Sequence, residues 1–134
     1  MGRVAGTQGP QAVTGLSPAG LLLVALGGAA GSVLRYLVSV LAVSVLGAAF
    51  PWGTLAVNIL GSAAIGVAAA TGLDGPARLL VVTGFLGGFT TFSAFSLETG
   101  VLLERSAALA VLYVAASVAL GLAAFALAWM LARR

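Results

Sequence analysis

The sequence predicts an all-α integral membrane protein with four transmembrane helices, the third of which is broken near its middle. Hydrophobic residues make up 61% of the 134 residues, and charged residues only 7%. Because a soluble domain carries about a quarter charged residues, this chain has too few to cover a surface that faces water. Four long apolar stretches follow one another, and the third contains glycines and hydroxyl residues at which a helix can open.

The inventory of reactive side chains argues against an enzyme. The chain has no cysteine and no histidine, and its only carboxylates belong to Asp74, Glu98 and Glu104. Disulfides, thiolate chemistry and imidazole metal sites are therefore excluded. The basic residues are all arginines, and they occur singly before the final pair Arg133 and Arg134, so they do not indicate nucleic-acid binding.

The N-terminal segment differs from the rest of the chain. Residues 1–18 are rich in Gly, Pro, Ser and Thr, and we predict a disordered tail there, followed by one membrane domain over residues 19–134. A signal peptide is the alternative, but the apolar stretch continues to Phe50 and is too long for one. The first helix is predicted over residues 19–46. It contains Arg35, which either has a function inside the membrane or extends to the interface.

The second helix, predicted over residues 51–70, carries a polar stripe. Thr54, Asn58 and Ser62 recur every four residues and share one helix face. Asn58 either makes an interhelical hydrogen bond or faces a pore, and from the residues alone the hydrogen bond is favoured.

The third helix, predicted over residues 76–103, contains the sequence GFLGGFTTFSAFS from Gly84 to Ser96. Backbone that leaves the helix at membrane depth must be covered by protein or line a water-filled cavity. Two glycines followed by two β-branched threonines predict that the helix opens over Gly87–Thr90. The opened backbone would offer carbonyls and amides to an ion.

The fourth helix is predicted over residues 106–131, with Tyr113 and Ser117 one turn apart. From the residues alone, packing between helices with a hydrogen bond is favoured over a functional role for this pair. Four helices place both termini on the same side of the membrane. Small residues in the first, second and third helices, at GxxxG spacing in the first and third, favour close helix approach and, in our interpretation, a homo- or hetero-oligomer.

Three motifs on successive helices indicate a family. They are GGAAGSVLRY (Gly27–Tyr36), GTLAVNILGS (Gly53–Ser62) and GFLGGFTTFSAFSLET (Gly84–Thr99). On these motifs the chain resembles the CrcB/Fluc family of fluoride channels over residues 20–130. The resemblance implies a passive channel in the cell membrane that lets fluoride leave the cytoplasm and so reduces its toxicity. It also implies a dual-topology dimer of two antiparallel copies, with two fluoride pores and a central sodium ion.

The resemblance also implies roles for individual residues. Backbone carbonyls of Gly87 and Thr90 would hold the sodium ion, and Arg35 would be the vestibule arginine. The residues implied for the fluoride pore include an amide, two rings and several hydroxyls: Asn58, Phe92, Phe95, Thr91, Ser93, Tyr113 and Ser117. The chain departs from the family pattern at Gly121, where the polar track on the last helix would continue, and at Ala94, where a hydroxyl is frequent.

The arginines are distributed unevenly about the predicted membrane. Arg3, Arg78, Arg133 and Arg134 lie on one side, while Arg105 alone lies clearly on the other. The positive-inside rule then predicts that both termini are cytoplasmic. Because a dual-topology homodimer should show little bias, an oppositely oriented paralogue is the alternative partner.

Two other functions fit a small four-helix membrane protein. A small multidrug transporter needs a carboxylate deep in the first helix, and no acidic residue precedes Asp74. A membrane assembly subunit that transports nothing would explain the glycine pairs but would leave Asn58, Phe92 and Phe95 without a role.

Overall fold

The computed structural model describes residues 16–134, which form an all-helical structure. Helix α1 spans Pro18–Leu46, α2 spans Trp52–Ala70 and α6 spans Ala107–Ala132. The third membrane segment is composite, with α3 (Gly75–Arg78), the π-helix η1 (Leu79–Leu86), α4 (Gly87–Phe89) and α5 (Phe92–Arg105). Within residues 16–134, four segments are long and apolar enough to cross a membrane, as predicted. The predicted disordered tail falls mostly on residues 1–15, which lie outside the described residues.

The helix ends follow local signals. Ser17 caps α1 by accepting a hydrogen bond from the amide of Gly20 at 2.9 Å, and Pro18 occupies the first helical turn. Gly47 ends α1 with a φ of 81°, a conformation that favours glycine. Ser106 accepts a hydrogen bond from the amide of Leu109 and so starts α6 directly after α5. The helix boundaries therefore lie within two residues of the predicted ones.

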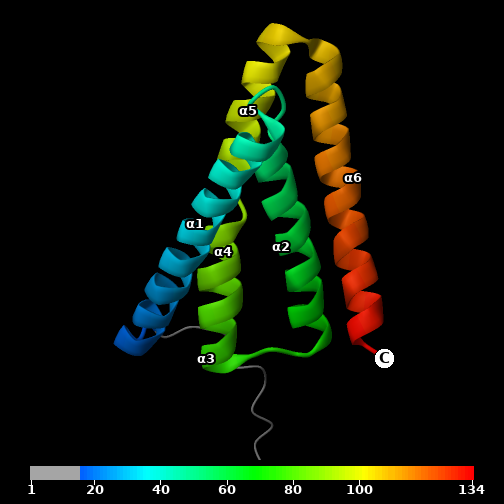
Figure 1. The fold of residues 1–134 in the computed structure, drawn as a ribbon. Coiled ribbons are helices and arrows are strands. Elements are labelled where there is room, and N and C mark those ends of the chain that lie inside the picture. The colour runs from blue at the N-terminus through cyan, green and yellow to red at the C-terminus, as the bar shows by residue number, and fades with distance from the viewer. Residues whose placement is uncertain (1–15) are drawn as a thin grey trace, which may run out of the picture.

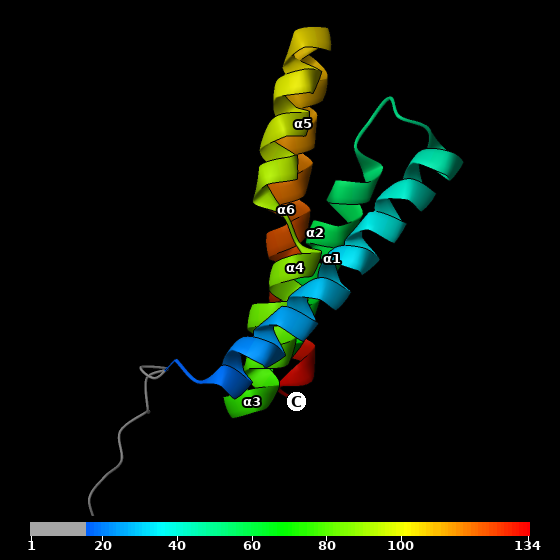
Figure 2. The same ribbon diagram turned by 90° about the vertical axis from the view of Figure 1, so that its left-hand side faces the viewer.

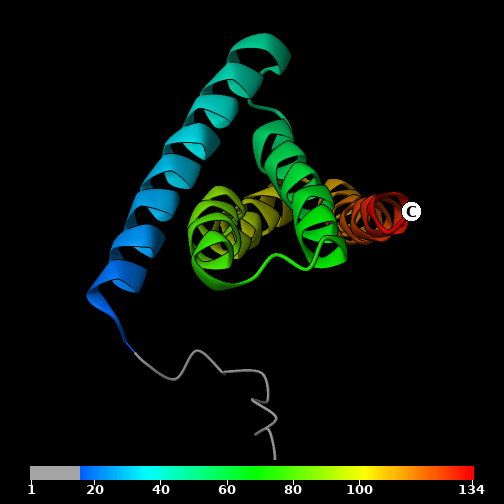
Figure 3. The ribbon, with the colours of Figure 1, turned by 90° about the horizontal axis from the view of Figure 1, so that it is seen from below.

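The helices are arranged so that α2 lies between α1 and α6 (Figures 1 and 3). The start of α1 and the C-terminus lie at the same end of the molecule (Figure 1), as an even number of spans requires. At the opposite end, α5 and α6 extend beyond the turn that joins α1 to α2 (Figure 2).

Helix α1 crosses the third segment in backbone contact through glycines. A Cβ atom on Gly27 would overlap the backbone of Leu80, and one on Gly31 would overlap the backbone of Phe85. From the other side, a Cβ on Gly84 would lie 2.9 Å from the carbonyl of Val24. The two GxxxG pairs thus pack against each other within one chain. The inference of an oligomer from these pairs therefore loses its support, although close helix approach is confirmed.

The break in the third segment lies later than predicted. The expected opening was Gly87–Thr90, but Gly87 and Gly88 remain helical. The extended residues are Thr90, with ψ 156°, and Thr91, with φ −151° and ψ 121°. Gly88 packs closely against α1, since a Cβ on Gly88 would overlap the carbonyl of Gly28. The helix restarts at Phe92, where the Thr91 hydroxyl accepts a hydrogen bond from the amide of Ala94 at 3.2 Å.

Candidate functional site

Asn58 of α2 forms hydrogen bonds with both the amide and the carbonyl of Thr91 at the break. Its Nδ2 donates to the carbonyl of Thr91 at 3.1 Å, and its Oδ1 accepts from the amide of Thr91 at 2.9 Å. This pair replaces the helical hydrogen bonds that Thr91 loses, as backbone at membrane depth requires. The interhelical hydrogen bond considered for Asn58 is therefore present. An amide NH₂ has two hydrogens, so the fixed Asn58 side chain still has one N–H to donate.

The two phenylalanines implied for the pore lie in the first turn of α5. Their ring centroids are 5.5 Å apart, and the ring of Phe95 also lies 5.3 Å from that of Tyr113. Phe95 is half-buried in the chain, whereas 79% of Phe92 is exposed. Phe92 thus lies on the surface of the single chain, and Phe95 lies partly in its interior.

Glu98 of α5 joins three helices through hydroxyl groups. Its Oε1 accepts from Thr54 Oγ1 of α2 at 2.7 Å, and its Oε2 accepts from the hydroxyl of Tyr113 of α6 at 2.7 Å. Sequence reasoning assigned no role to Glu98. The polar stripe that contains Thr54 was the only signal for this network. The Tyr113 hydroxyl must leave Glu98 before it can donate to an ion.

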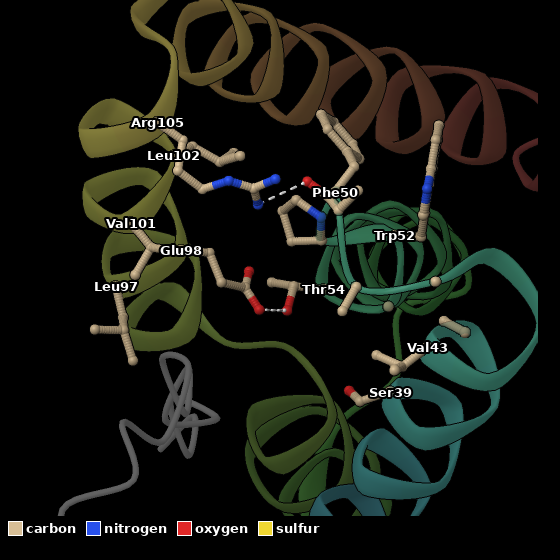
Figure 4. A pocket seen from close by; sticks show the side chains of 16 residues that line it. Ser39, Val43, Phe50, Trp52, Thr54, Leu97, Glu98, Val101, Leu102 and Arg105 are labelled. Carbon is tan, nitrogen blue, oxygen red and sulfur yellow. Dashed lines mark hydrogen bonds between the residues drawn. The ribbon is translucent and has the colours of Figure 1, made fainter.

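A cavity of about 250 Å³ lies beside this network (Figure 4). Glu98 and Thr54 line it from α5 and α2, together with the turn that joins α1 to α2. Arg105 lies at the end of α5 and donates from Nη1 to the carbonyl of Ala49 in that turn at 3.2 Å (Figure 4). Arg105 therefore fastens the turn to α5.

A second cavity, of about 340 Å³, lies at the break. It brings together residues of α2 and the third segment that were predicted to act on ions, and Ser62 with them: Asn58, Ser62, Gly87, Thr90, Thr91 and Phe92. Thr91 Oγ1 and Ser93 Oγ are 3.2 Å apart, so one of the two hydroxyls donates to the other. Ser117 of α6 has a buried hydroxyl without a hydrogen-bond partner among the described residues.

Arg35 is not part of this group. It donates from Nε to the carbonyl of Gly88 at 3.0 Å, and Ser32 Oγ lies 3.5 Å from the same oxygen. Arg35 therefore contacts the break from the side of α1. Its implied role in a vestibule remains a prediction.

Some backbone carbonyls near the break accept hydrogen bonds, and others have no donor among the described residues and could hold a cation. The carbonyl of Leu86 accepts from the amide and hydroxyl of Thr90 at 3.0 and 2.9 Å, and those of Gly88 and Thr91 accept from Arg35 and Asn58. The described residues provide no donor to the carbonyls of Gly87 and Thr90. Within residues 16–134 no cluster of three or more His, Cys, Asp or Glu side chains offers an alternative metal site. Oxygen-only ligands suit a hard cation such as sodium.

The family model and the curated relatives that match this chain agree with one another. The family described as CrcB-like protein, camphor resistance (CrcB), matches residues 22–129. A relative from Rhizobium johnstonii, named fluoride-specific ion channel FluC, is 58% identical over 109 residues, which cover 77% of this chain and 87% of the relative. Proteins of the same name from Chelativorans sp. and Hyphomonas neptunium are 51% and 50% identical, over 84% and 86% of this chain and 95% and 96% of their own length.

Proposed function

The chain belongs to the CrcB family, and we propose that it is a channel through which fluoride leaves the cytoplasm across the cell membrane. The close relatives named as fluoride-specific ion channels support this function and agree with the expectation that the chain is not an enzyme. The four apolar helices agree with a location in the membrane.

The observation that best supports a fluoride path is the amide of Asn58. Fluoride is small and strongly hydrated, so a pore must replace its water with hydrogen-bond donors. Thr91 fixes the Asn58 side chain and uses only one of its two N–H groups. The other N–H is available within a cavity that Phe92 also lines. Phenylalanine ring edges add a weak positive contact, and weak sites in series allow an ion to leave as well as to enter.

The same cavity supports the proposal of an antiparallel dimer around a sodium ion. The carbonyls of Gly87 and Thr90 have no donor within residues 16–134, and both residues line this cavity. Two carbonyls from each of two copies would give a cation site made only of oxygen. Phe92, which is largely exposed in a single chain, would gain contacts in such a dimer and would face the path of its partner.

The charge distribution supports cytoplasmic termini. Arg78, Arg133 and Arg134 lie at the end of the molecule where α1 begins, and Arg105 lies at the other end (Figure 1). The partner is then either an inverted copy of this chain or an inverted paralogue. Reporter fusions at the C-terminus distinguish the two, because a homodimer of dual topology requires equal signals on both sides.

Two substitutions separate a channel from an assembly subunit that transports nothing. In a channel, Asn58→Ala and Phe92→Ile abolish fluoride efflux while the assembly measured by size-exclusion chromatography stays intact. Ser96→Ala is the matched control, because the hydroxyl of Ser96 only bonds the carbonyl of Phe92 in its own helix at 2.9 Å. Unchanged efflux in both variants would refute the assigned pore.

A further inference from the structure

Two serines differ from all other serines of residues 16–134. The others use their hydroxyl to cap a helix, to bond a carbonyl or to pair with another hydroxyl. Ser62 of α2 and Ser117 of α6 have no hydrogen-bond partner among the described residues. A hydroxyl in an apolar environment is destabilising unless it is hydrogen-bonded. Of the two, Ser62 lines a cavity, so its hydroxyl is available to an ion that enters that cavity.

Ser62 is the next polar residue after Asn58 along α2 and therefore along the proposed path of the ion. The two residues are one turn apart on the same face of α2. Ser62 also lines the cavity of about 340 Å³ that contains Asn58, Thr91 and Phe92. Its side chain is only half-buried, so the hydroxyl can be reached from this cavity.

Ser62 also faces a gap in the polar residues of α6. Gly121 lies one turn beyond Ser117 and is buried. A Cβ atom built on Gly121 would lie 3.5 Å from Ser62 Oγ, and no other neighbouring atom would lie within 4 Å of it. The hydroxyl of Ser62 thus lies beside Gly121, where α6 has no side chain.

We propose that Ser62 supplies, from α2, the fluoride-binding hydroxyl that α6 lacks at Gly121. The inference rests on the proposed fluoride channel and adds a residue to its path. Asn58 and Ser62 then present an amide and a hydroxyl to the ion in succession. Each contact is weak, as passage of an ion requires.

The first test removes the hydroxyl and keeps the Cβ atom. Fluoride efflux from liposomes that contain the purified Ser62→Ala variant should be about fivefold slower than wild type, the factor expected for one net hydrogen bond. Ser44→Ala is the matched control, because the hydroxyl of Ser44 bonds only the carbonyl of Leu41 at 2.8 Å. Wild-type efflux from Ser62→Ala would overturn the inference.

The second test transfers the hydroxyl from position 62 of α2 to position 121 of α6. Ser62→Gly should slow efflux, and the double variant Ser62→Gly with Gly121→Ser should restore it. The Cβ at position 121 has room, and loss of the side chain at position 62 enlarges the space. A role in packing alone predicts no such rescue, so a double variant that stays slow would overturn the inference. Absence of efflux from the folded wild type, both alone and with an oppositely oriented paralogue, would instead refute the proposed function.

Discussion

Arg35 donates from Nε to the carbonyl of Gly88 at 3.0 Å and so ties α1 to the third segment, just before the break. This bond satisfies a charged group inside an apolar helix by using a carbonyl that the broken helix leaves unpaired. The carbonyl of Gly88 therefore accepts a hydrogen bond from Arg35, whereas the carbonyls of Gly87 and Thr90 have no donor among the described residues. The arginine thereby helps to determine which backbone oxygens remain available for a cation.

Arg35→Met should therefore lower the thermal stability of the protein and weaken the stabilisation that the proposed sodium ion would give. Loss of a hydrogen bond from a charged donor destabilises by about 1.5–3 kcal/mol. Melting of the detergent-solubilised protein in sodium and in choline salts measures both effects. Arg78→Met is the control, because Arg78 is exposed at the end of α3 and has no side-chain hydrogen bond among the described residues. Equal melting temperatures for the Arg35 variant and wild type would contradict the assignment.

The glycine crossing of α1 predicts opposite results at two adjacent positions. Gly27→Ala should destabilise the chain strongly, because its Cβ would overlap the backbone at Leu80 and Phe85. Gly28→Ala should be tolerated, since the nearest atom to its Cβ is the carbonyl oxygen of Gly84 at 3.8 Å. Denaturation measured by circular dichroism compares the two. Equal stability of the two variants would show that the helices do not cross at these residues.

Gly87→Ala tests whether a second copy covers the break. A Cβ on Gly87 meets only the carbonyl of Val82 at 3.9 Å, so the single chain accommodates it. If the free carbonyl of Gly87 faces a partner across a cation, the added methyl should convert dimers to monomers in size-exclusion chromatography. Gly100→Ala, which meets no atom within 4 Å, should leave the assembly intact. An intact dimer in the Gly87 variant would place the dimer centre elsewhere.

Tyr113→Phe and Glu98→Gln should show coupled effects on stability. Each variant alters the 2.7 Å hydrogen bond between the two side chains, which lie in different helices. A double-mutant cycle should give a coupling free energy of about 1 kcal/mol, the range found for hydrogen bonds between membrane helices. The measurement is the unfolding free energy of the four proteins in detergent. Additive effects would mean that the bond contributes no stability.

Features that depend on local sequence could be predicted, whereas features that depend on contacts between residues far apart in the sequence mostly could not. The spans were predictable because hydrophobicity and capping residues are local signals, as at Ser17 and Pro18. The break was placed too early because glycine propensity is a local signal and does not register the close packing of Gly88 against α1. The two partners of Glu98 were not predictable, since restarting α5 at Phe92 changes which residues face α2 and α6. The GxxxG pairs correctly predicted close approach, but their spacing does not say whether the neighbour belongs to the same chain.

The most direct test of the proposed channel is fluoride efflux from liposomes that contain this purified chain alone, followed with a fluoride electrode. Valinomycin in a potassium gradient removes the electrical block to movement of an anion. A channel formed by two copies of this chain predicts rapid fluoride efflux, with chloride retained in a parallel measurement. Folded protein that releases no fluoride, both alone and with an oppositely oriented paralogue, would contradict the proposed function.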